Sequence, residues 1–247
     1  MKIPKSHPRY LSLMQRHAIE EGMRKGIVAP AGLIAHGRGE ALDYLLGEKT
    51  SGVAKRAIRA AAAELLLAER PIISVNGNCA ALCAREIIAL RKALPNSAIE
   101  VNLFYRTRGR EEKIARLFAG MGEKILGADK KNQTKIAGLD SARRVVDKRG
   151  IALADTVLVM LEDGDRTEAL RAIGKRVIAV DLNPLSRTAK KAHITIVDNV
   201  CRALPLLARE AKLLGKAKTP KLRALSRVFS NSNNLRASLE LIRKGRS

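Results

Sequence analysis

The feature that most constrains the fold is an alternation of short β-branched runs with longer helical segments, which begins at residue 71. The run PIISV at 71–75 stops at Asn-Gly-Asn, and a helical pattern over 80–94 follows directly. Strands that alternate with helices at this spacing predict parallel βαβ units, and therefore an α/β fold with a doubly wound, mostly parallel sheet. Further strands are expected at 99–104, 154–161, 176–181 and 193–198, and further helices at 110–122, 166–174 and 199–214.

Helical segments flank this core on both sides. Residues 1–70 form an N-terminal helical part, with helices expected at 12–25 and 51–68, and with a glycine-rich loop expected at 29–40. Residues 216–247 hold nine Lys or Arg and one Glu, and part of this basic extension has helical periodicity, so we expect a docked helix. A chain of 247 residues can be filled by one α/β domain with helical additions. We predict a single domain over 1–247, with its core at 71–215.

The formal net charge of +23 indicates an anionic partner but does not identify it. Nucleic acid is one such partner, because Lys and Arg that neutralise phosphates release counterions. A basic RNA-binding protein with an α/β core is therefore one alternative, and a non-catalytic nucleotide-binding regulator is another. Aromatic residues make up only 2% of the chain, and RRM, KH and zinc-finger signatures are absent, which disfavours specific nucleic-acid binding. ATP and a phosphorylated substrate are also anions, so an enzyme that binds them would account for the positive charge equally well.

Two other classes of protein are disfavoured by the sequence. No apolar run reaches the roughly 20 residues that span a bilayer, and the first residues lack the apolar core of a signal peptide, so a cytoplasmic location without membrane attachment is expected. The three cysteines form no C-x-x-C pair, which argues against a disulfide framework and a structural metal site. Cys79 and Cys83 are one helical turn apart and are expected to face the core.

In a doubly wound sheet, ligands bind beyond the carboxyl ends of the strands, so the loops there are the candidate sites. Neither a P-loop nor a G-x-G-x-x-G after the first strand is present. The most informative loop is 181–188, where Asp181 and Asn183 can bind ribose hydroxyls or a base edge, and Arg187 with Thr188 can bind phosphate. The alternative for this segment is a plain turn with a surface charge, and spacing alone leaves both open.

Two further segments place arginines beside glycines. Arg38 lies between two glycines and beside His36, and Arg106, Arg108 and Arg110 follow the strand expected at 99–104. Each group of cations can bind phosphate, or can be a solvated surface, and a lone histidine of this kind is more often structural than catalytic.

Longer blocks of the sequence resemble archaeal phosphopantothenate synthetase. They include IPKSHPRYLSL, GLIAHGRGEALDYLLGE, SVNGNCAAL, NLFYRTRGRE, LGADKKNQTKIAGLDSARR and VDLNPLSRTA, which extend from residue 3 to about residue 199. The resemblance implies a homodimeric ligase with a Rossmann-like core. It would convert ATP, 4-phosphopantoate and beta-alanine to 4'-phosphopantothenate, AMP and diphosphate, in coenzyme A biosynthesis.

The resemblance also implies a reaction route and the residues that contact ATP. Release of AMP indicates an acyl-adenylate intermediate, whose formation needs positioning and charge stabilisation more than a protein nucleophile. Mg²⁺ is expected with the ATP phosphates. No catalytic base and no protein metal ligand is assigned. The ATP contacts carried over are Arg16, Arg38, Asp181, Leu182, Asn183, Arg187, Thr188, Asn199 and Val200.

The phosphate of the second substrate is expected at loops that ATP does not use. Asn76, Gly77 and Asn78 lie where a strand opens a helix, so backbone N–H groups and the helix dipole can receive an anion, with Arg106 or Arg108 as a mobile cation. The stretch 129–132 is expected nearby. The alternative is that Asn-Gly-Asn only turns the chain and caps the helix.

Overall fold

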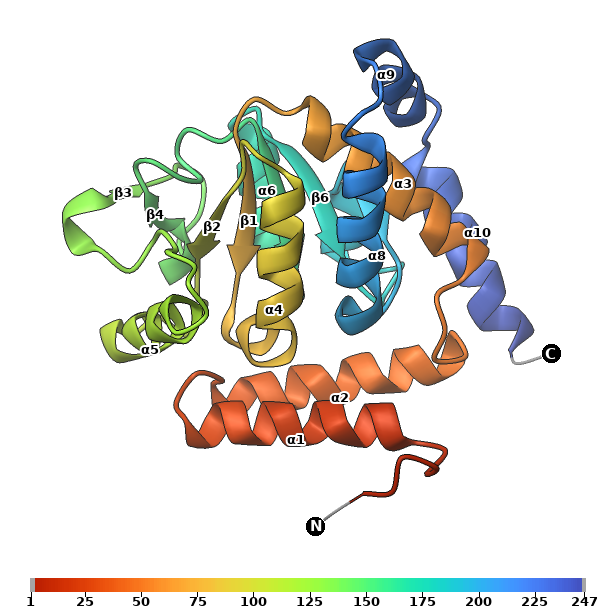
Figure 1. Cartoon of the computed structure of the whole chain (residues 1–247), viewed down its shortest axis with the longest axis horizontal. Helices are drawn as coiled ribbons and strands as arrows, with labels where there is room; N and C mark the ends of the chain where they lie inside the picture. The colour runs from red at the N-terminus through yellow and green to blue at the C-terminus, as the bar shows by residue number, and fades with distance from the viewer. Residues whose placement is uncertain (1–2, 246–247) are drawn as a thin grey trace.

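The computed structural model describes residues 3–245 and has a five-stranded parallel sheet at its centre (Figure 1). The strand order is β2-β1-β5-β6-β7, and every neighbouring pair is parallel. This confirms the predicted α/β fold with a doubly wound, Rossmann-like sheet. The strands are β1 (Pro71–Val75), β2 (Ala98–Val101), β5 (Thr156–Met160), β6 (Arg176–Val180) and β7 (Ile194–Ile196).

The direction in which the sheet grows reverses at β1. The chain passes from β1 to β2 on one side, then returns to place β5 on the other side of β1. Such a reversal opens a crevice at the carboxyl ends of the two strands that flank it, here β1 and β5. The helices that connect and follow the strands are α4 (Gly77–Ala93), α5 (Arg108–Ala119), α6 (Gly164–Ala172), α7 (Arg187–Lys191) and α8 (Val200–Leu214).

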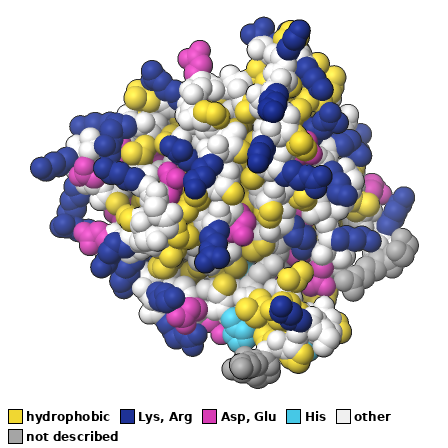
Figure 2. Space-filling view, viewed as in Figure 1, with side chains coloured by type: hydrophobic (Ala, Val, Ile, Leu, Met, Phe, Trp, Pro, Cys, Tyr) yellow, Lys and Arg dark blue, Asp and Glu magenta, His cyan; other side chains and the backbone are white. Residues whose placement is uncertain are grey.

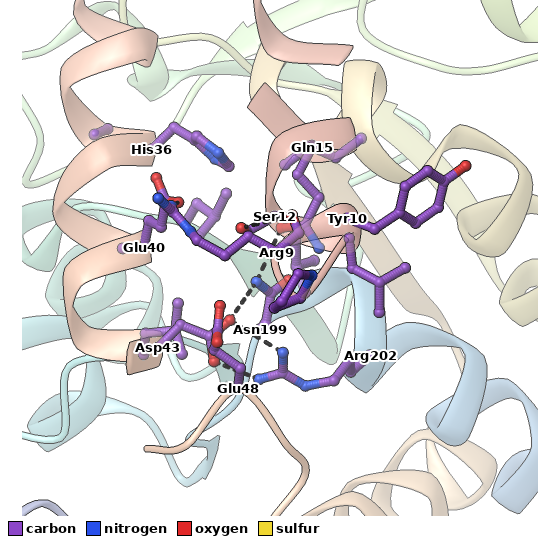
Figure 3. A pocket seen from close by; sticks show the side chains of 18 of the residues that line it. Arg9, Tyr10, Ser12, Gln15, His36, Glu40, Asp43, Glu48, Asn199 and Arg202 are labelled. Carbon is purple, nitrogen blue, oxygen red and sulfur yellow. Dashed lines mark hydrogen bonds and ion pairs between the residues drawn. The ribbon is translucent and has the colours of Figure 1, made fainter. Parts of the chain in front are cut away.

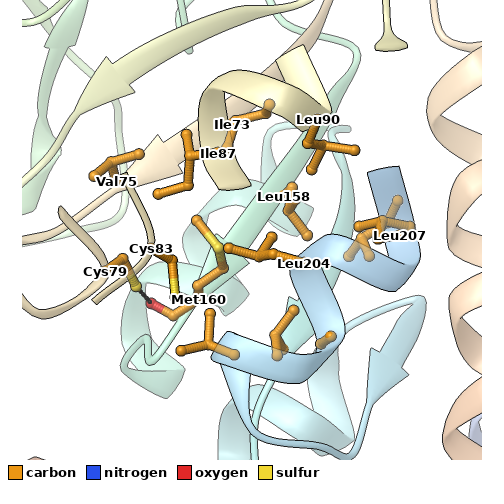
Figure 4. Close-up of a cluster of buried hydrophobic side chains, with 14 of the residues drawn as sticks. Ile73, Val75, Cys79, Cys83, Ile87, Leu90, Leu158, Met160, Leu204 and Leu207 are labelled. Carbon is orange, nitrogen blue, oxygen red and sulfur yellow. Dashed lines mark hydrogen bonds between the residues drawn. The ribbon is translucent and has the colours of Figure 1, made fainter. Parts of the chain in front are cut away.

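A separate apolar core covers each face of the sheet. Successive side chains of a strand point to opposite faces, so Ile73 packs with α4 and α8 whereas Ile72 packs with α6. Figure 4 shows the first of these cores, where Leu158 and Leu204 meet between the sheet and the two helices. Cys79 and Cys83 are buried in this core, as predicted. Because both faces are covered, the strands must be apolar on both sides, which explains their continuous β-branched runs.

The N-terminal part is helical, but it contains one helix that the sequence did not predict. Residues 29–40 were expected to form a loop; they belong instead to α2 (Pro30–Leu45), so this expectation was wrong. Gly32 serves close packing, because a Cβ there would lie 2.3 Å from the Asn78 Oδ1 atom. Helix propensity is a weak preference that tertiary contacts override. The helices on either side were predicted, and they are α1 (Tyr10–Arg24) and α3 (Gly52–Leu67).

The position of α1 and α2 matters for ligand binding. Figure 1 shows the two helices lying across the lower edge of the sheet, where the strands end and α4 and α8 begin. The carboxyl edge is therefore covered by a helical layer instead of being open to solvent.

The C-terminal extension is docked, with two helices where one was expected. Helix α9 (Thr219–Arg227) contacts α3, and α10 (Asn231–Lys244) contacts α3, α7 and β7. Asn231 anchors α10, because its Nδ2 donates to the carbonyl groups of Ala189 and Ala192 while its Oδ1 accepts from the Thr195 N–H. A small antiparallel pair, β3 (Gln133–Lys135) and β4 (Val145–Asp147), was not predicted. Within residues 3–245, no helix is long and apolar enough to cross a membrane.

Candidate functional site

Two adjoining cavities lie at the covered carboxyl edge of the sheet. The larger, of about 560 Å³, is enclosed by the N-terminal segment, α1, α2 and the residues that follow β6 and β7; we call it the α1–α2 cavity. The smaller, of about 340 Å³, lies over the crevice between β1 and β5; we call it the switch-point cavity. Ala35 and Leu161 line both, so the two cavities meet at these residues.

Ion pairs organise the floor of the α1–α2 cavity. Arg202 of α8 lies within 3.0 Å of a carboxylate oxygen of Asp43 and within 2.8 Å of one of Asp198. Asn199 caps α8 by accepting from the Cys201 N–H, and its Nδ2 donates to Asp43 at 2.9 Å. Figure 3 shows Asp43, Asn199 and Arg202 joined in this way. The network fixes the start of α8 against α2.

Glu40 of α2 joins this helix to α1 and to the N-terminal segment at another part of the cavity. Its carboxylate pairs with Arg9 at 2.6 Å and with Arg16 at 2.9 Å, so both helices and the N-terminal segment converge on it. The Arg9 guanidinium also lies 5.1 Å from the ring centroid of Tyr44. Hydrogen bonding to Glu40 raises the pKa of Arg16.

His36 is the imidazole of α2 that lines the α1–α2 cavity. Figure 3 shows its ring directed from α2 toward Gln15 of α1. The Nε2 atom is buried, and it has no hydrogen-bond partner among the described residues. Burial lowers the pKa of His36, and Arg16 lowers it further while Glu40 opposes the change. The ring is therefore neutral at pH 7.

The switch-point cavity is built around the Asn-Gly-Asn turn. Asn76 caps α4 by accepting from the Cys79 N–H, and its Nδ2 donates to the Met160 carbonyl at the end of β5. Asn78 donates to the Gly32 carbonyl of α2. A Cβ on Gly77 would lie 2.4 Å from the Ile27 carbonyl oxygen. The turn thus caps the helix, as the alternative interpretation held, and it also lines the cavity.

Three arginines line the switch-point cavity, and one of them is deeply buried. Arg143 pairs with Glu162 and, at 3.2 Å, with Asp163, and its guanidinium lies 5.9 Å from the ring centroid of Phe104. Burial lowers the pKa of Arg143 to about 10, which leaves it charged at pH 7. The other two are Arg38 and Arg110.

The predicted phosphate cations occupy other places. Arg106 does not line either cavity, and it is held rather than mobile: it pairs with buried Glu111 at 2.7 Å and donates to the Val145 carbonyl at 2.7 Å. Arg108 is exposed and pairs with Glu112 one turn along α5. The stretch 129–132 forms a short turn before β3 and also lies outside both cavities.

The residues expected to contact ATP are divided between the cavities and a neighbouring loop. Leu182, Asn199 and Val200 line the α1–α2 cavity, and Arg16 reaches it through Glu40. Arg38 lines the switch-point cavity, on a helix and not on the expected loop. Asp181, Asn183, Arg187 and Thr188 follow β6 and line neither cavity.

The loop after β6 is nevertheless tied to the site. The Thr188 hydroxyl donates to the Glu162 carbonyl at 2.9 Å, and Arg187 pairs with Asp165 at 2.7 Å and Glu168 at 2.9 Å. Burial raises the pKa of Asp181, although it accepts from the Asn183 N–H and the nearby Ser186 hydroxyl. The loops after β5 and β6 therefore form one connected unit.

Sequence reasoning missed several cavity residues: Arg143 in the switch-point cavity, and Arg9, Glu40, Asp43 and Arg202 in the α1–α2 cavity. Arg143 lies in a short 3-10 turn (Ala142–Arg144) directly before β4, a strand that the sequence did not predict, so no strand end or glycine motif marked it. Only the return of the chain toward β1 brings it to the crevice. Arg110 had a signal, since it belongs to the Arg cluster after β2.

Comparisons with known proteins agree with the resemblance. The family model for phosphopantothenate/pantothenate synthetase matches residues 53–245. A 4-phosphopantoate–beta-alanine ligase of Thermococcus onnurineus is 59% identical over 218 residues, which cover 86% of this chain and 82% of that protein. Ligases of the same name from Methanosarcina mazei and Methanospirillum hungatei are 46% identical over 98% of this chain and over 94% and 97% of their own lengths. The chain therefore belongs to the phosphopantothenate/pantothenate synthetase family.

Proposed function

We propose that the protein is an ATP-dependent ligase that joins 4-phosphopantoate to beta-alanine, giving 4'-phosphopantothenate, AMP and diphosphate for coenzyme A biosynthesis. The observation that carries this proposal is the identity of 46–59% to ligases of that name over most of the chain. Two adjoining cavities at the carboxyl edge of the sheet support it, because an acyl substrate and a nucleotide must meet there.

ATP would bind with its nucleoside in the α1–α2 cavity and its phosphates toward the junction. Leu182, Asn199 and Val200 line the part of the cavity beside β6 and β7. The start of α8, which Asn199 caps, favours negative charge. The cations and hydroxyl that would meet the phosphates are Arg16, Arg38, Arg187 and Thr188, with Asp181 and Asn183 as polar contacts.

The phosphate of 4-phosphopantoate would bind in the switch-point cavity at the start of α4. The Asn76-Gly77-Asn78 turn offers backbone N–H groups there, and the absence of a side chain at Gly77 lets the Arg110 guanidinium lie close to the turn. Arg110 and Arg143 line the same cavity and supply positive charge. Arg106 and Arg108 stay candidates on the condition that they leave Glu111 and Glu112.

This placement supports activation of the carboxylate as an acyl-adenylate. The pantoate carboxylate would attack the α-phosphorus of ATP where the cavities meet, releasing diphosphate, and the amine would then displace AMP. The arginines would position both anions and stabilise charge in the transition state. Mg²⁺, when bound, neutralises charge on the ATP phosphates. No group of three or more metal-ligating side chains is found among residues 3–245, and Mg²⁺ held through phosphates needs only one or two carboxylates, such as Asp163 and Asp165.

A homodimer is part of the same proposal. Helices α1 and α2 expose large apolar side chains, with Leu11 at 71% and Ile34 at 69% of full exposure. Exposed apolar side chains that form one contiguous patch mark subunit contacts, and we propose that these two belong to such a patch. Light scattering coupled to gel filtration should give a mass near twice that of one chain.

The test of the activity is release of diphosphate and AMP from a mixture of ATP, 4-phosphopantoate and beta-alanine, with the product identified by mass. All three substrates should be required. With ATP and 4-phosphopantoate alone, labelled diphosphate should exchange into ATP, because adenylation does not need the amine. Formation of ADP and phosphate in place of AMP would rule out the acyl-adenylate.

A further inference from the structure

We propose that His36 is the general base that removes a proton from the ammonium group of beta-alanine. This inference rests on the proposed function and assigns a step that the nucleotide and phosphate contacts leave open. The main observation behind it is that His36 lines the α1–α2 cavity. Its Nε2 atom is buried there and has no hydrogen-bond partner among the described residues.

The chemistry requires a proton acceptor. The amine of beta-alanine is protonated at neutral pH and has no lone pair to attack with. The first proton would pass from nitrogen to His36. The nitrogen lone pair then forms the C–N bond to the acyl carbon, and the C–O bond breaks with its electron pair leaving on AMP. The second N–H proton is lost to solvent as AMP departs, so amide, AMP and two protons balance the acyl-adenylate and the ammonium.

The geometry places His36 where this transfer is needed. Ala35, its neighbour in α2, lines both cavities and marks their junction. The imidazole faces the α1–α2 cavity, toward Gln15 (Figure 3). A polar nitrogen that is buried without a hydrogen bond costs free energy, so a ligand group that reaches it would be favoured.

Four of the carboxylates that line the cavities are already paired with cations. Glu40 is paired with Arg9 and Arg16, and Asp43 is paired with Arg202. In the switch-point cavity, Glu162 and Asp163 are paired with Arg143. Drawing a proton onto any of these would break an ion pair, whereas His36 gains a hydrogen bond.

The charges around His36 decide its protonation state. Burial keeps the ring neutral at pH 7, so it can accept a proton, and Glu40 one turn along α2 would stabilise the imidazolium that forms. Arg16, from α1, acts in the opposite sense. The other titratable or charged groups that line this cavity are Lys5, His7, Arg9, Tyr10, Asp43, Glu48 and Arg202.

The decisive variant is His36→Gln, which keeps a polar side chain but cannot take up a proton. Turnover with beta-alanine should fall roughly 10²- to 10⁴-fold, the usual contribution of a general base. The ATP–diphosphate exchange with 4-phosphopantoate should stay within a few-fold, because that half-reaction involves no amine. His17→Gln, an exposed histidine of α1 outside both cavities, is the matched control and should change neither rate.

Hydroxylamine separates proton removal from a structural role. Its amine is unprotonated at neutral pH, so attack on the acyl-adenylate needs no base, and His36→Gln should form the hydroxamate at close to the normal rate. Loss of the beta-alanine and hydroxylamine reactions by the same factor, or equal loss of the exchange reaction, would overturn the assignment. Absence of exchange in the unsubstituted protein would count instead against the acyl-adenylate itself.

The pH profile gives a second readout. Because burial lowers the pKa of His36, kcat/KM for beta-alanine should fall on the acid side as the imidazole becomes protonated, and this limb should be missing when hydroxylamine is the nucleophile. If kcat/KM falls on the acid side in the same way with beta-alanine and with hydroxylamine, the group that titrates is not His36.

Discussion

The arginines at the carboxyl edge of the sheet differ in how deeply they are buried and in whether acidic side chains already pair with them. Arg38 is exposed on α2, and Arg187 pairs with acidic side chains in an exposed position. Exposed pairs contribute little to stability, so these guanidinium groups can turn to a ligand at small cost. Arg143 is buried between Glu162 and Asp163, and it can meet a ligand only from its fixed position. The exposed arginines suit contacts with a ligand that enters and leaves, and the buried Arg143 suits a rigid wall of the cavity.

The first prediction concerns ATP use. Arg38→Ala and Arg187→Ala should each lower kcat/KM for ATP roughly 10- to 100-fold, because one charge-assisted phosphate contact is lost. The melting temperature should be nearly unchanged, since both side chains are exposed. Steady-state kinetics with each substrate varied in turn is the measurement.

The two variants also test which ligand each arginine meets. Arg38 lines the switch-point cavity, so a selective rise of the KM for 4-phosphopantoate would assign it to that substrate instead of ATP. Normal ATP kinetics in both variants would show that the nucleotide lies elsewhere.

The second prediction places the substrate phosphate. Arg110→Ala should raise the KM for 4-phosphopantoate about tenfold or more, and that for ATP or beta-alanine much less, because only one substrate loses an ion pair. Arg108→Ala is the control from the same helix, because the Arg108 side chain pairs with Glu112 and lines neither cavity. If Arg108→Ala or Arg106→Ala has the larger effect, the phosphate lies at the outer side of α5 instead.

At the scale of elements, three of the helices that begin at the carboxyl edge have a side-chain cap that also lines a cavity. Asn76 caps α4, Asp163 caps α6 and Asn199 caps α8. Their positive ends therefore converge on the region where two polyanions are proposed to bind, which favours negative charge without a P-loop.

The third prediction concerns the joint between α5 and the β3–β4 pair. Arg106 links them, since it pairs with Glu111 of α5 and donates to the carbonyl groups of Val145 and Gly127. Arg106→Ala would leave Glu111 buried and unpaired, which should lower the free energy of unfolding by about 3 kcal/mol. Arg108→Ala removes an exposed pair on the same helix and should cost less than about 1 kcal/mol.

Denaturant unfolding of the two variants under the same conditions measures this difference. Equal stability of both would mean that the Arg106–Glu111 pair contributes no more than a surface contact. Retained stability together with a raised KM for 4-phosphopantoate in Arg106→Ala would favour a direct role in phosphate binding.

At the scale of the whole molecule, positive charge is spread widely. Figure 2 shows Lys and Arg side chains over all of the visible face, with acidic side chains among them. A nucleic-acid binder concentrates its cations along a track that follows the phosphate backbone. The distribution on this face has no such track.

The fourth prediction follows from this distribution. RNA and duplex DNA should bind the protein only weakly at physiological salt, and the binding should weaken steeply as salt rises, because it depends on counterion release alone. Fluorescence anisotropy over a salt series is the measurement. Tight binding to one RNA sequence that survives high salt would favour the RNA-binding alternative.

The sequence by itself determined the sheet and the order of its elements. All five parallel strands were predicted, because a strand buried on both faces must be apolar along its whole length and glycine or asparagine marks its end. Helices α4, α5, α6 and α8 were predicted as well, whereas the short helix α7 between β6 and β7 was expected to be a turn. The Asn76–Asn78 turn was also identified as a candidate site, and it lines the switch-point cavity. Ligand binding there and at the residues after β6 stays a prediction. These signals are local, so one sequence is enough to see them.

Only the tertiary structure decided how the site is assembled. Residues 30–40 form a helix because α2 packs on α1 and on the start of α4, and the contact with α4 joins segments far apart in the chain. The same packing brings His36 to the α1–α2 cavity, and the path of the chain before β4 brings Arg143 to the crevice. Arg106 is held by Glu111 for a similar reason. A cation paired inside the fold and one free to meet a ligand have the same local sequence, because the difference lies in partners that only folding supplies.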